Sequence, residues 1–175
     1  MSVMSFFRRF MRRQDGAAAA EVALLFPLIT WPFFLCMEAG FMQMRRVMME
    51  RAIDVVARDI RLGKPGLDTA DRIKAAVCDQ ALVLPTCMSD LMLEMTPVQV
   101  ENFQPPSESA TCVDRSKDAQ PKTTFKPGTI NEMMMMRFCI LYDPILPGAG
   151  IGARMEQVNG GGVAIIASTF FVNEP

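Results

Sequence analysis

The sequence predicts an α+β fold with a long N-terminal helix, a second helix and a small antiparallel sheet. Three observations predict it. A long apolar run near the N-terminus continues into a segment with helical periodicity, a shorter helical pattern follows, and three stretches in the second half have strand character. The chain has 175 residues, which suits one modest domain with an additional segment.

The apolar run follows a basic leader, residues 1–16, which contains four arginines and one acid. From Val22 to Met37 the chain carries no charge, and its extension to Met44 gives a stretch of 23 residues. At 1.5 Å per residue this stretch makes about 34 Å of helix. A hydrocarbon core is about 30 Å thick, so we expect residues 17–44 to cross a membrane. Residues 45–175 then form the head.

Residues 41–62 continue the helix with an amphipathic pattern, and glycine and proline end it after Leu62. We therefore expect one continuous helix from about Ala17 to Leu62, which lies half in the membrane and half in the head. Its predicted apolar stripe consists of Met44, Met48, Ala52, Val55 and Val56.

The second predicted helix has Asp68 as its N-cap and ends before Pro85. Its apolar stripe consists of Ala70, Ile73, Val77 and Ala81.

The three strand candidates are residues 91–100, 133–142 and 163–172. Proline at position 97 assigns the second half of the first candidate to a sheet edge, because proline lacks the amide hydrogen. The last candidate is apolar on both faces, which predicts a central strand. Residues 104–128 are rich in Pro, Ser, Thr and Lys and are predicted to form a surface loop.

Composition argues against several functions. The net charge is −1 and no basic run follows the leader, which speaks against a nucleic-acid partner. The chain has no histidine, no CxxC motif and no nucleophile elbow, so we expect no enzyme, no cofactor, no metal site and no small-molecule substrate. The MMMM run at 133–136 could suggest copper(I), but strand alternation would put its sulfurs on opposite faces, which favours core packing.

Four of the five cysteines lie in the head, and the fifth, Cys36, lies inside the apolar run. We expect Cys78 to pair with Cys87 across a short helix-to-strand connection, and Cys112 to pair with Cys139 between the long loop and a strand. Free buried thiols are the alternative. Disulfides require an oxidising compartment, so they favour a head outside the cytoplasm.

The stretch GAAAAEVALLFP places a carboxylate, Glu21, at the start of the predicted span. A charge at the centre of a spanning helix costs roughly 2.5–3.5 kcal/mol, and less near the interface. Glu21 could simply extend to the interface, or it could pair with a new α-amine formed by cleavage between Gly16 and Ala17. No small-residue signal-peptidase site follows the apolar core. An uncleaved signal anchor stays open as an alternative.

The basic leader, the glycine, the small residues and the glutamate before an apolar helix resemble the processing site of type IV pilins and pseudopilins. More narrowly, QDGAAAAEVALLFP resembles the opening of TadE-like proteins of the tight-adherence (Flp-type) pilus, and Pro27 fits that pattern. The resemblance implies a prepilin peptidase, an aspartic peptidase of the membrane, that cuts after Gly16. It also implies that Glu21 sets the register between subunits. Position 22 is Val, whereas major pilins commonly have an aromatic residue there.

Two further elements look TadE-like, one in the middle of the chain and one at its C-terminal end. They are Arg137, Phe138, Cys139, Tyr142 and Pro144 in the strand region, and Phe171, Asn173, Glu174 and Pro175 at the end.

The resemblance implies a non-enzymatic minor pilin with a pilin-like fold that takes part in pilus assembly. Its expected partners are the membrane, the prepilin peptidase and other pilin-like subunits, including a companion minor pilin and the assembly platform. Its expected location is the bacterial inner membrane, with a single span, the head in the periplasm and incorporation into an extracellular pilus as an option. The alternative function is an uncleaved single-pass anchor that scaffolds an envelope complex.

Overall fold

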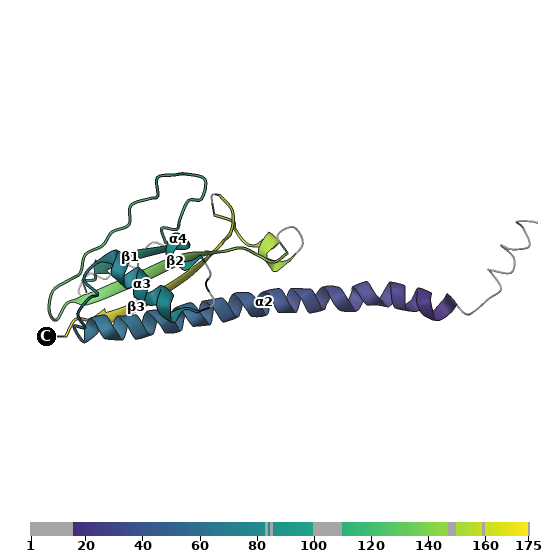
Figure 1. Ribbon diagram of the computed structural model, residues 1–175, viewed down its shortest axis with the longest axis horizontal. Coiled ribbons are helices and arrows are strands. Elements are labelled where there is room, and N and C mark those ends of the chain that lie inside the picture. Colours follow the sequence, from purple (N-terminus) through teal and green to yellow (C-terminus); the bar gives the residue numbers. More distant parts are fainter. Residues whose placement is uncertain are drawn as a thin grey trace, which may run out of the picture. The chain divides into compact units, whose positions relative to one another are not determined.

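The structure is a computed structural model that describes residues 16–82, 84, 86–99, 110–146, 150–158 and 160–174. The arginines of the leader and the first part of the predicted loop lie outside the described residues. The elements, shown in Figure 1, are α2 (Ala17–Arg61), α3 (Ala70–Gln80), α4 (Cys87–Asp90), β1 (Leu91–Pro97), β2 (Met133–Tyr142), the 3₁₀ helix η2 (Ile151–Arg154) and β3 (Val163–Val172). The predicted α+β class is confirmed.

Helix α2 is one unbroken helix from Ala17 to Arg61, within one residue of the predicted end, although Pro27 and Pro32 lie inside it. Contacts divide the chain into two compact units, Met1–Met37 and Glu38–Pro175, so α2 contributes to both. The second unit is the head. Residues 38–44, which the sequence assigns to the predicted span, belong to it by their contacts.

The sheet of the head has the order β1-β2-β3, and both neighbouring pairs are antiparallel. The prediction of β3 as the central strand is therefore wrong, because β2 is central and β3 forms an edge. The apolar residues on the outer face of β3 misled the prediction, since they are not covered by another layer. Ile166 is 36% exposed, Phe170 47% and Val172 41%.

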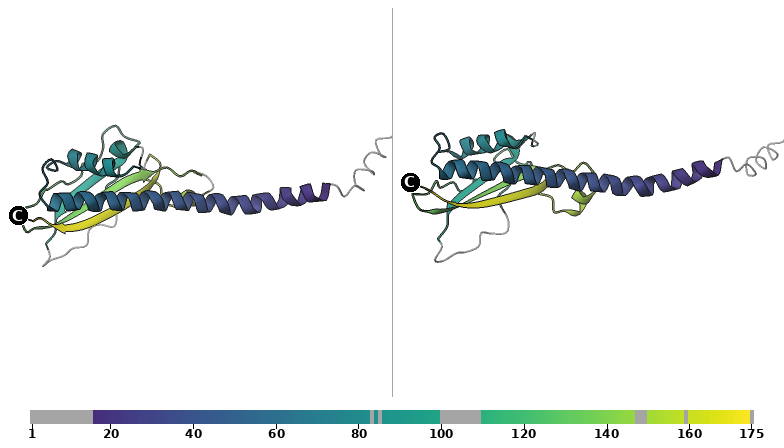
Figure 2. Two further views of the ribbon diagram at one scale, coloured as in Figure 1. Left: turned by 60° about the horizontal axis from the view of Figure 1, so that its bottom comes forward. Right: turned by 90° about the horizontal axis from the view of Figure 1, so that it is seen from below.

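Helices α2 and α3 lie on one face of the sheet, as the two views in Figure 2 show. The predicted α2 stripe is right for Ala52 and Val56 but wrong for Met44 and Val55, which are exposed. Apolar residues in this segment occur in adjacent pairs, so two neighbouring faces of the helix fit the 3.6-residue repeat almost equally well. Packing on the sheet selects one of these two faces. The buried α2 positions are Met49, Ala52, Ile53, Val56 and Ala57.

Strand β2 is buried on both faces. Met134, Met136, Phe138, Ile140 and Tyr142 share the face toward the helices, as the alternation predicts, and join the main core. On the other face, Leu141 of β2 and Met92 of β1 pack against Val113 and Cys112 of the loop between β1 and β2. The loop therefore covers this face of the sheet, and methionines 134–136 serve packing on both sides.

The N-cap of α3 is Thr69 and not the predicted Asp68. Asp68 lies one residue further out and forms an ion pair with Arg72, four residues along, which accounts for its position. The predicted stripe is confirmed at Ile73 and Val77, which are fully buried. The four-residue helix α4 was not predicted from the sequence.

Two disulfides brace the head, and they join the pairs that the sequence favours. Cys78 of α3 bonds to Cys87 of α4, with a separation of 9 residues. Cys112 of the covering loop bonds to Cys139 of β2, with a separation of 27 residues. Cys36 is free and exposed on α2. The first bridge ties two neighbouring helices, and the second holds the loop onto the central strand.

The two bridges are expected to differ in their effect on stability. By loop entropy, replacing Cys112 and Cys139 together with alanine should lower the free energy of unfolding by about 3.5 kcal/mol. The Cys78→Ala, Cys87→Ala double variant should lower it by about 2.5 kcal/mol. Denaturant unfolding of the full chain in detergent, followed by far-UV circular dichroism, measures both. A larger loss for the shorter bridge would contradict this assignment.

Candidate functional site

The proposed cleavage site lies where the described helix starts. Gly16 directly precedes α2 and is exposed, and Ala17 is the first residue of the helix. A Cβ placed on Gly16 would meet no atom within 4 Å, and its φ lies outside the left-handed region. Neither packing nor backbone conformation among the described residues therefore requires glycine at position 16.

Glu21 lies on the second turn of α2 and is exposed. It forms no ion pair with any of the described residues. The structure thus leaves its carboxylate open to a partner from outside this set, which can be a cation of another chain or of the leader.

The part of α2 in the first unit exposes apolar side chains on all its faces. Such a surface is costly in water but suits lipid or other apolar helices. By length and composition, α2 can cross a membrane. The exposed residues are Val22, Leu24, Leu25, Phe26, Leu28, Ile29, Trp31, Phe33, Phe34 and Met37.

Glu38 is the functional candidate that the sequence analysis missed. It is the first residue of the head and is only 2% exposed. Its Oε1 accepts a hydrogen bond from the backbone N–H of Leu146 at 3.0 Å, and its Oε2 accepts one from Ile151 at 2.8 Å. Both donors belong to the segment between β2 and β3. A lone charged residue at the end of an apolar run was the available signal, but the partner backbone is more than 100 positions away.

Gly150 completes the contact around Glu38. Gly150 is buried, and a Cβ there would overlap the carboxylate of Glu38. On the same segment, a Cβ on Gly152 would overlap the ring of Pro144. Gly150 and Gly152 therefore allow close approach of the backbone, the first to the glutamate and the second to the proline ring. Sequence alone shows these glycines only as loop residues.

A second buried carboxylate, Asp90, binds an arginine of the covering loop, which is the loop between β1 and β2. Arg115 of that loop donates to Asp90 Oδ2 from Nη2 at 2.7 Å and to Oδ1 from Nε at 3.3 Å. The same guanidinium donates from Nη1 to Asp143, just beyond β2, at 2.6 Å. One arginine thus joins the loop to the residues before β1 and after β2.

Burial raises the pKa of Asp90, but the hydrogen bonds from Arg115 and Thr86 and the positive charge of Arg115 together lower it by more. The pKa of Asp90 therefore lies below its ordinary value of 3.8. The two carboxylates likewise raise the pKa of Arg115, which stays charged at all relevant pH values. The cluster braces the covering loop against α4 and the end of β2.

The structure brings together part of the predicted site. It pairs the four head cysteines, it places Ala17 and Glu21 in the first two turns of α2, and Gly16 directly precedes that helix. The described residues contain no group of three or more His, Cys, Asp or Glu side chains that could hold a metal ion.

Comparisons with protein-family models, with curated proteins and with solved structures find no match. The architecture is nevertheless pilin-like, since a long N-terminal apolar helix precedes a small antiparallel sheet. An apolar N-terminal helix and a disulfide-bonded head are the features of a membrane anchor with an extracytoplasmic domain.

The Asp90 cluster gives a pH-dependent prediction. Because the folded-state pKa lies below the unfolded value of about 3.9, its stabilisation is present above about pH 4 and is lost as pH falls through the folded-state pKa. We expect Asp90→Asn to lower the free energy of unfolding at neutral pH by about 1–3 kcal/mol. The variant should then lose less stability than the wild type as the solution is acidified.

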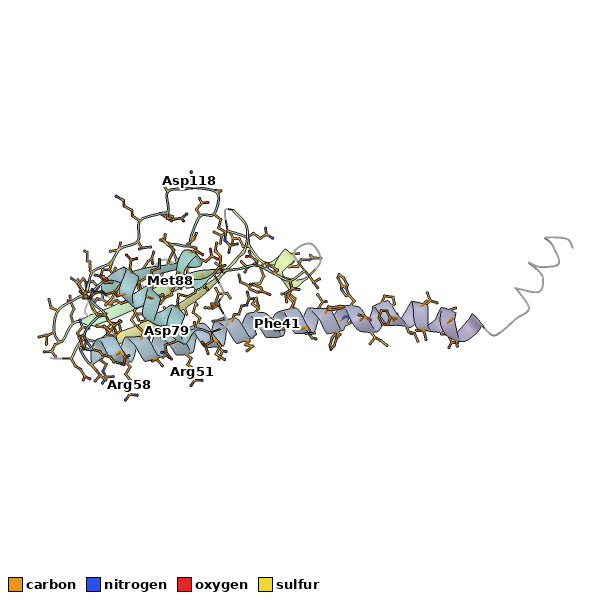
Figure 3. The ribbon with its side chains drawn as sticks, viewed as in Figure 1. Phe41, Arg51, Arg58, Asp79, Met88 and Asp118 are labelled. Atoms are coloured by element: carbon orange, nitrogen blue, oxygen red, sulfur yellow. A yellow bond between two sulfur atoms is a disulfide. The ribbon has the colours of Figure 1, made fainter. Side chains whose placement is uncertain are left out.

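Denaturant unfolding of the full chain in a non-ionic detergent, repeated across the acidic range, measures this difference. Asp118→Asn is the matched control. Asp118 lies on the exposed outer part of the covering loop (Figure 3) and forms no ion pair with the described residues. An equal acid-induced loss in the wild type and in Asp90→Asn would rule out this role for Asp90.

Proposed function

We propose that this chain is a TadE-like minor pilin, or pseudopilin, of a bacterial tight-adherence (Flp-type) pilus. In this proposal a prepilin peptidase removes the leader by cutting between Gly16 and Ala17. The observation that carries the proposal is the position of α2, which begins at Ala17 and continues without a break into the core of the head. The mature chain would then begin with the helix itself.

The surroundings of Gly16 support this interpretation. Since no described atom lies near a Cβ at this position, the fold gives no reason for glycine there. Recognition by a peptidase supplies one, because a residue without a side chain lets the backbone approach a catalytic site closely. The exposed alanines at 18–20 add a slender helix start with little steric bulk.

Cleavage would give Glu21 a partner. The new α-amine of Ala17 would lie about one helical turn from the Glu21 carboxylate, or it would reach that of a neighbouring subunit. Pairing removes much of the cost of placing the carboxylate near the apolar part of the bilayer. Glu21 then acts in subunit register and not in catalysis.

The apolar surface of residues 17–37 would contact lipid in the inner membrane and pilin-like helices during assembly. The disulfide-braced head would lie in the periplasm, where thiols are oxidised. The proposed partners are the prepilin peptidase, a companion minor pilin, the pilus subunit and the assembly platform. The proposed role needs no cofactor and no enzymatic activity.

Processing is testable by mass. In a host that supplies a prepilin peptidase, the wild-type chain should lose residues 1–16, and Gly16→Ala should keep them. Gly40→Ala is the matched control, because Gly40 also lies in open space but within α2. Intact-mass spectrometry of membrane-extracted protein reads the result. Retention of the leader in the wild type would favour the uncleaved anchor instead.

A substitution at Glu21 should impair pilus assembly without impairing cleavage of the leader. Glu21→Ala should still be cleaved, because Gly16 is unchanged, but it should reduce pilus formation or co-purification of pilin-like partners severely. Glu21→Gln keeps the size without the charge and should fail in the same way. Glu50→Ala, a change at an exposed carboxylate on α2 in the head, is the control. Normal pilus numbers with Glu21→Ala, counted by electron microscopy, would disprove the registering role.

A further inference from the structure

The segment that binds Glu38 has features of a membrane-surface element. We call residues 144–146 and 150–154 the interfacial segment. Its backbone is fixed by the two hydrogen bonds to Glu38, and Leu146 accepts a further bond from the N–H of Gly150 at 2.9 Å. Pro144 packs closely on Gly152. The segment is thus held at one defined level along α2.

That level follows from the length of the helix. The twenty residues 18–37 make about 30 Å of helix, which equals the thickness of a hydrocarbon core. The head begins at the next residue, Glu38. Lipid cannot cover the side of α2 on which Glu38 is buried, because the interfacial segment already covers it. Glu38 and its bound segment therefore lie at the level of the lipid headgroups when residues 18–37 fill the core.

The exposed side chains of the interfacial segment suit that level. Ile145 is 56% exposed and Ile151 is 36% exposed. Arg154, at the end of η2, is exposed and forms no ion pair with the described residues. Two apolar side chains and one cation on a short segment match the combination that binds lipid interfaces, where apolar groups reach the acyl boundary and cations meet phosphates.

We propose that the interfacial segment rests on the membrane leaflet that faces the head, with Ile145 and Ile151 inserted and Arg154 at the lipid phosphates. The head then contacts the bilayer through this segment as well as through α2. The bound carboxylate of Glu38 makes this possible, because its two backbone donors let the charge lie beside the lipid without water. The proposal depends on the membrane-spanning role of α2 and not on cleavage of the leader.

A tryptophan at position 151 can test the depth of the segment. The chain has a single tryptophan, which is Trp31 in the apolar part of α2, so Trp31→Phe gives a silent background. Ile151→Trp in this background is the probe. Phe170→Trp is the matched control, because Phe170 is a comparably exposed apolar residue on the outer face of β3. The full chain is reconstituted into phosphatidylethanolamine–phosphatidylglycerol vesicles with brominated acyl chains.

The expected result is a blue-shifted emission from position 151 that brominated lipid quenches several-fold more strongly than the emission from position 170. Equal, weak quenching at both positions would overturn the proposal, because it places the segment in water. A blue shift without quenching by brominated lipid would also overturn it, because it indicates that protein, such as a second copy of the chain, covers the segment.

The role of Glu38 is tested in the same system. Glu38→Gln keeps the size of the side chain, but its amide NH₂ would face a backbone N–H, so one of the two bonds is lost. Quenching at position 151 should fall, while that at position 170 stays unchanged. Intact disulfides, shown by a lack of thiol labelling at the four head cysteines, confirm that the head remains folded. Unchanged quenching in Glu38→Gln would show that the carboxylate does not hold the segment.

Discussion

The structure depends on one helix that meets two different environments. From Val22 to Met37, α2 exposes apolar side chains on all its faces, which suits lipid. From Glu38 to Arg61 the same helix has a single buried stripe, and that stripe supplies a large part of the head's core. The helix is unbroken over Ala17–Arg61, so one element of secondary structure supplies both surfaces.

The change between the two environments takes place at Glu38. A carboxylate in this position would be unfavourable if it faced lipid alone, and the loop between β2 and β3 prevents this by supplying two backbone donors. The same contact explains the glycine at position 150, where a side chain would displace the carboxylate. One interaction thus links the end of the apolar helix to a loop more than 100 residues later in the chain.

The rest of the head reinforces this core from the other side. The loop between β1 and β2 covers the outer face of the central strand, and it is held there by the Cys112–Cys139 bridge and by Arg115. The outer face of β3 remains uncovered, so the two faces of the sheet are unequal. The disulfide and the arginine cluster act on the same loop and both limit its separation from β2.

Local patterns predict the limits of the long helix to within one residue, the strand positions and the cysteine pairs. They failed where the outcome depends on distant packing. The stripe on α2 has two nearly equal phases, and contact with the sheet selects the one that contains Met49 and Ile53.

The position of β3 in the sheet depends on which strand has both faces covered, and an apolar sequence does not reveal that. The role of Glu38 is not visible in the sequence, because its partners are backbone groups of a remote loop and have no sequence signature. The processing site at Gly16 has the opposite character. It is visible in the sequence, and the fold neither requires nor opposes it.

Helix α2 is continuous from Ala17 to Arg61, exposed and apolar in its first part and packed in the head in its second. Amide hydrogen exchange of the full chain in lipid nanodiscs, resolved along α2, tests this most directly. We expect slow exchange without interruption through residues 38–44, because these residues lie inside the continuous helix α2. Fast exchange confined to these residues would contradict helical continuity, because it would show that the backbone hydrogen bonds of α2 are broken there.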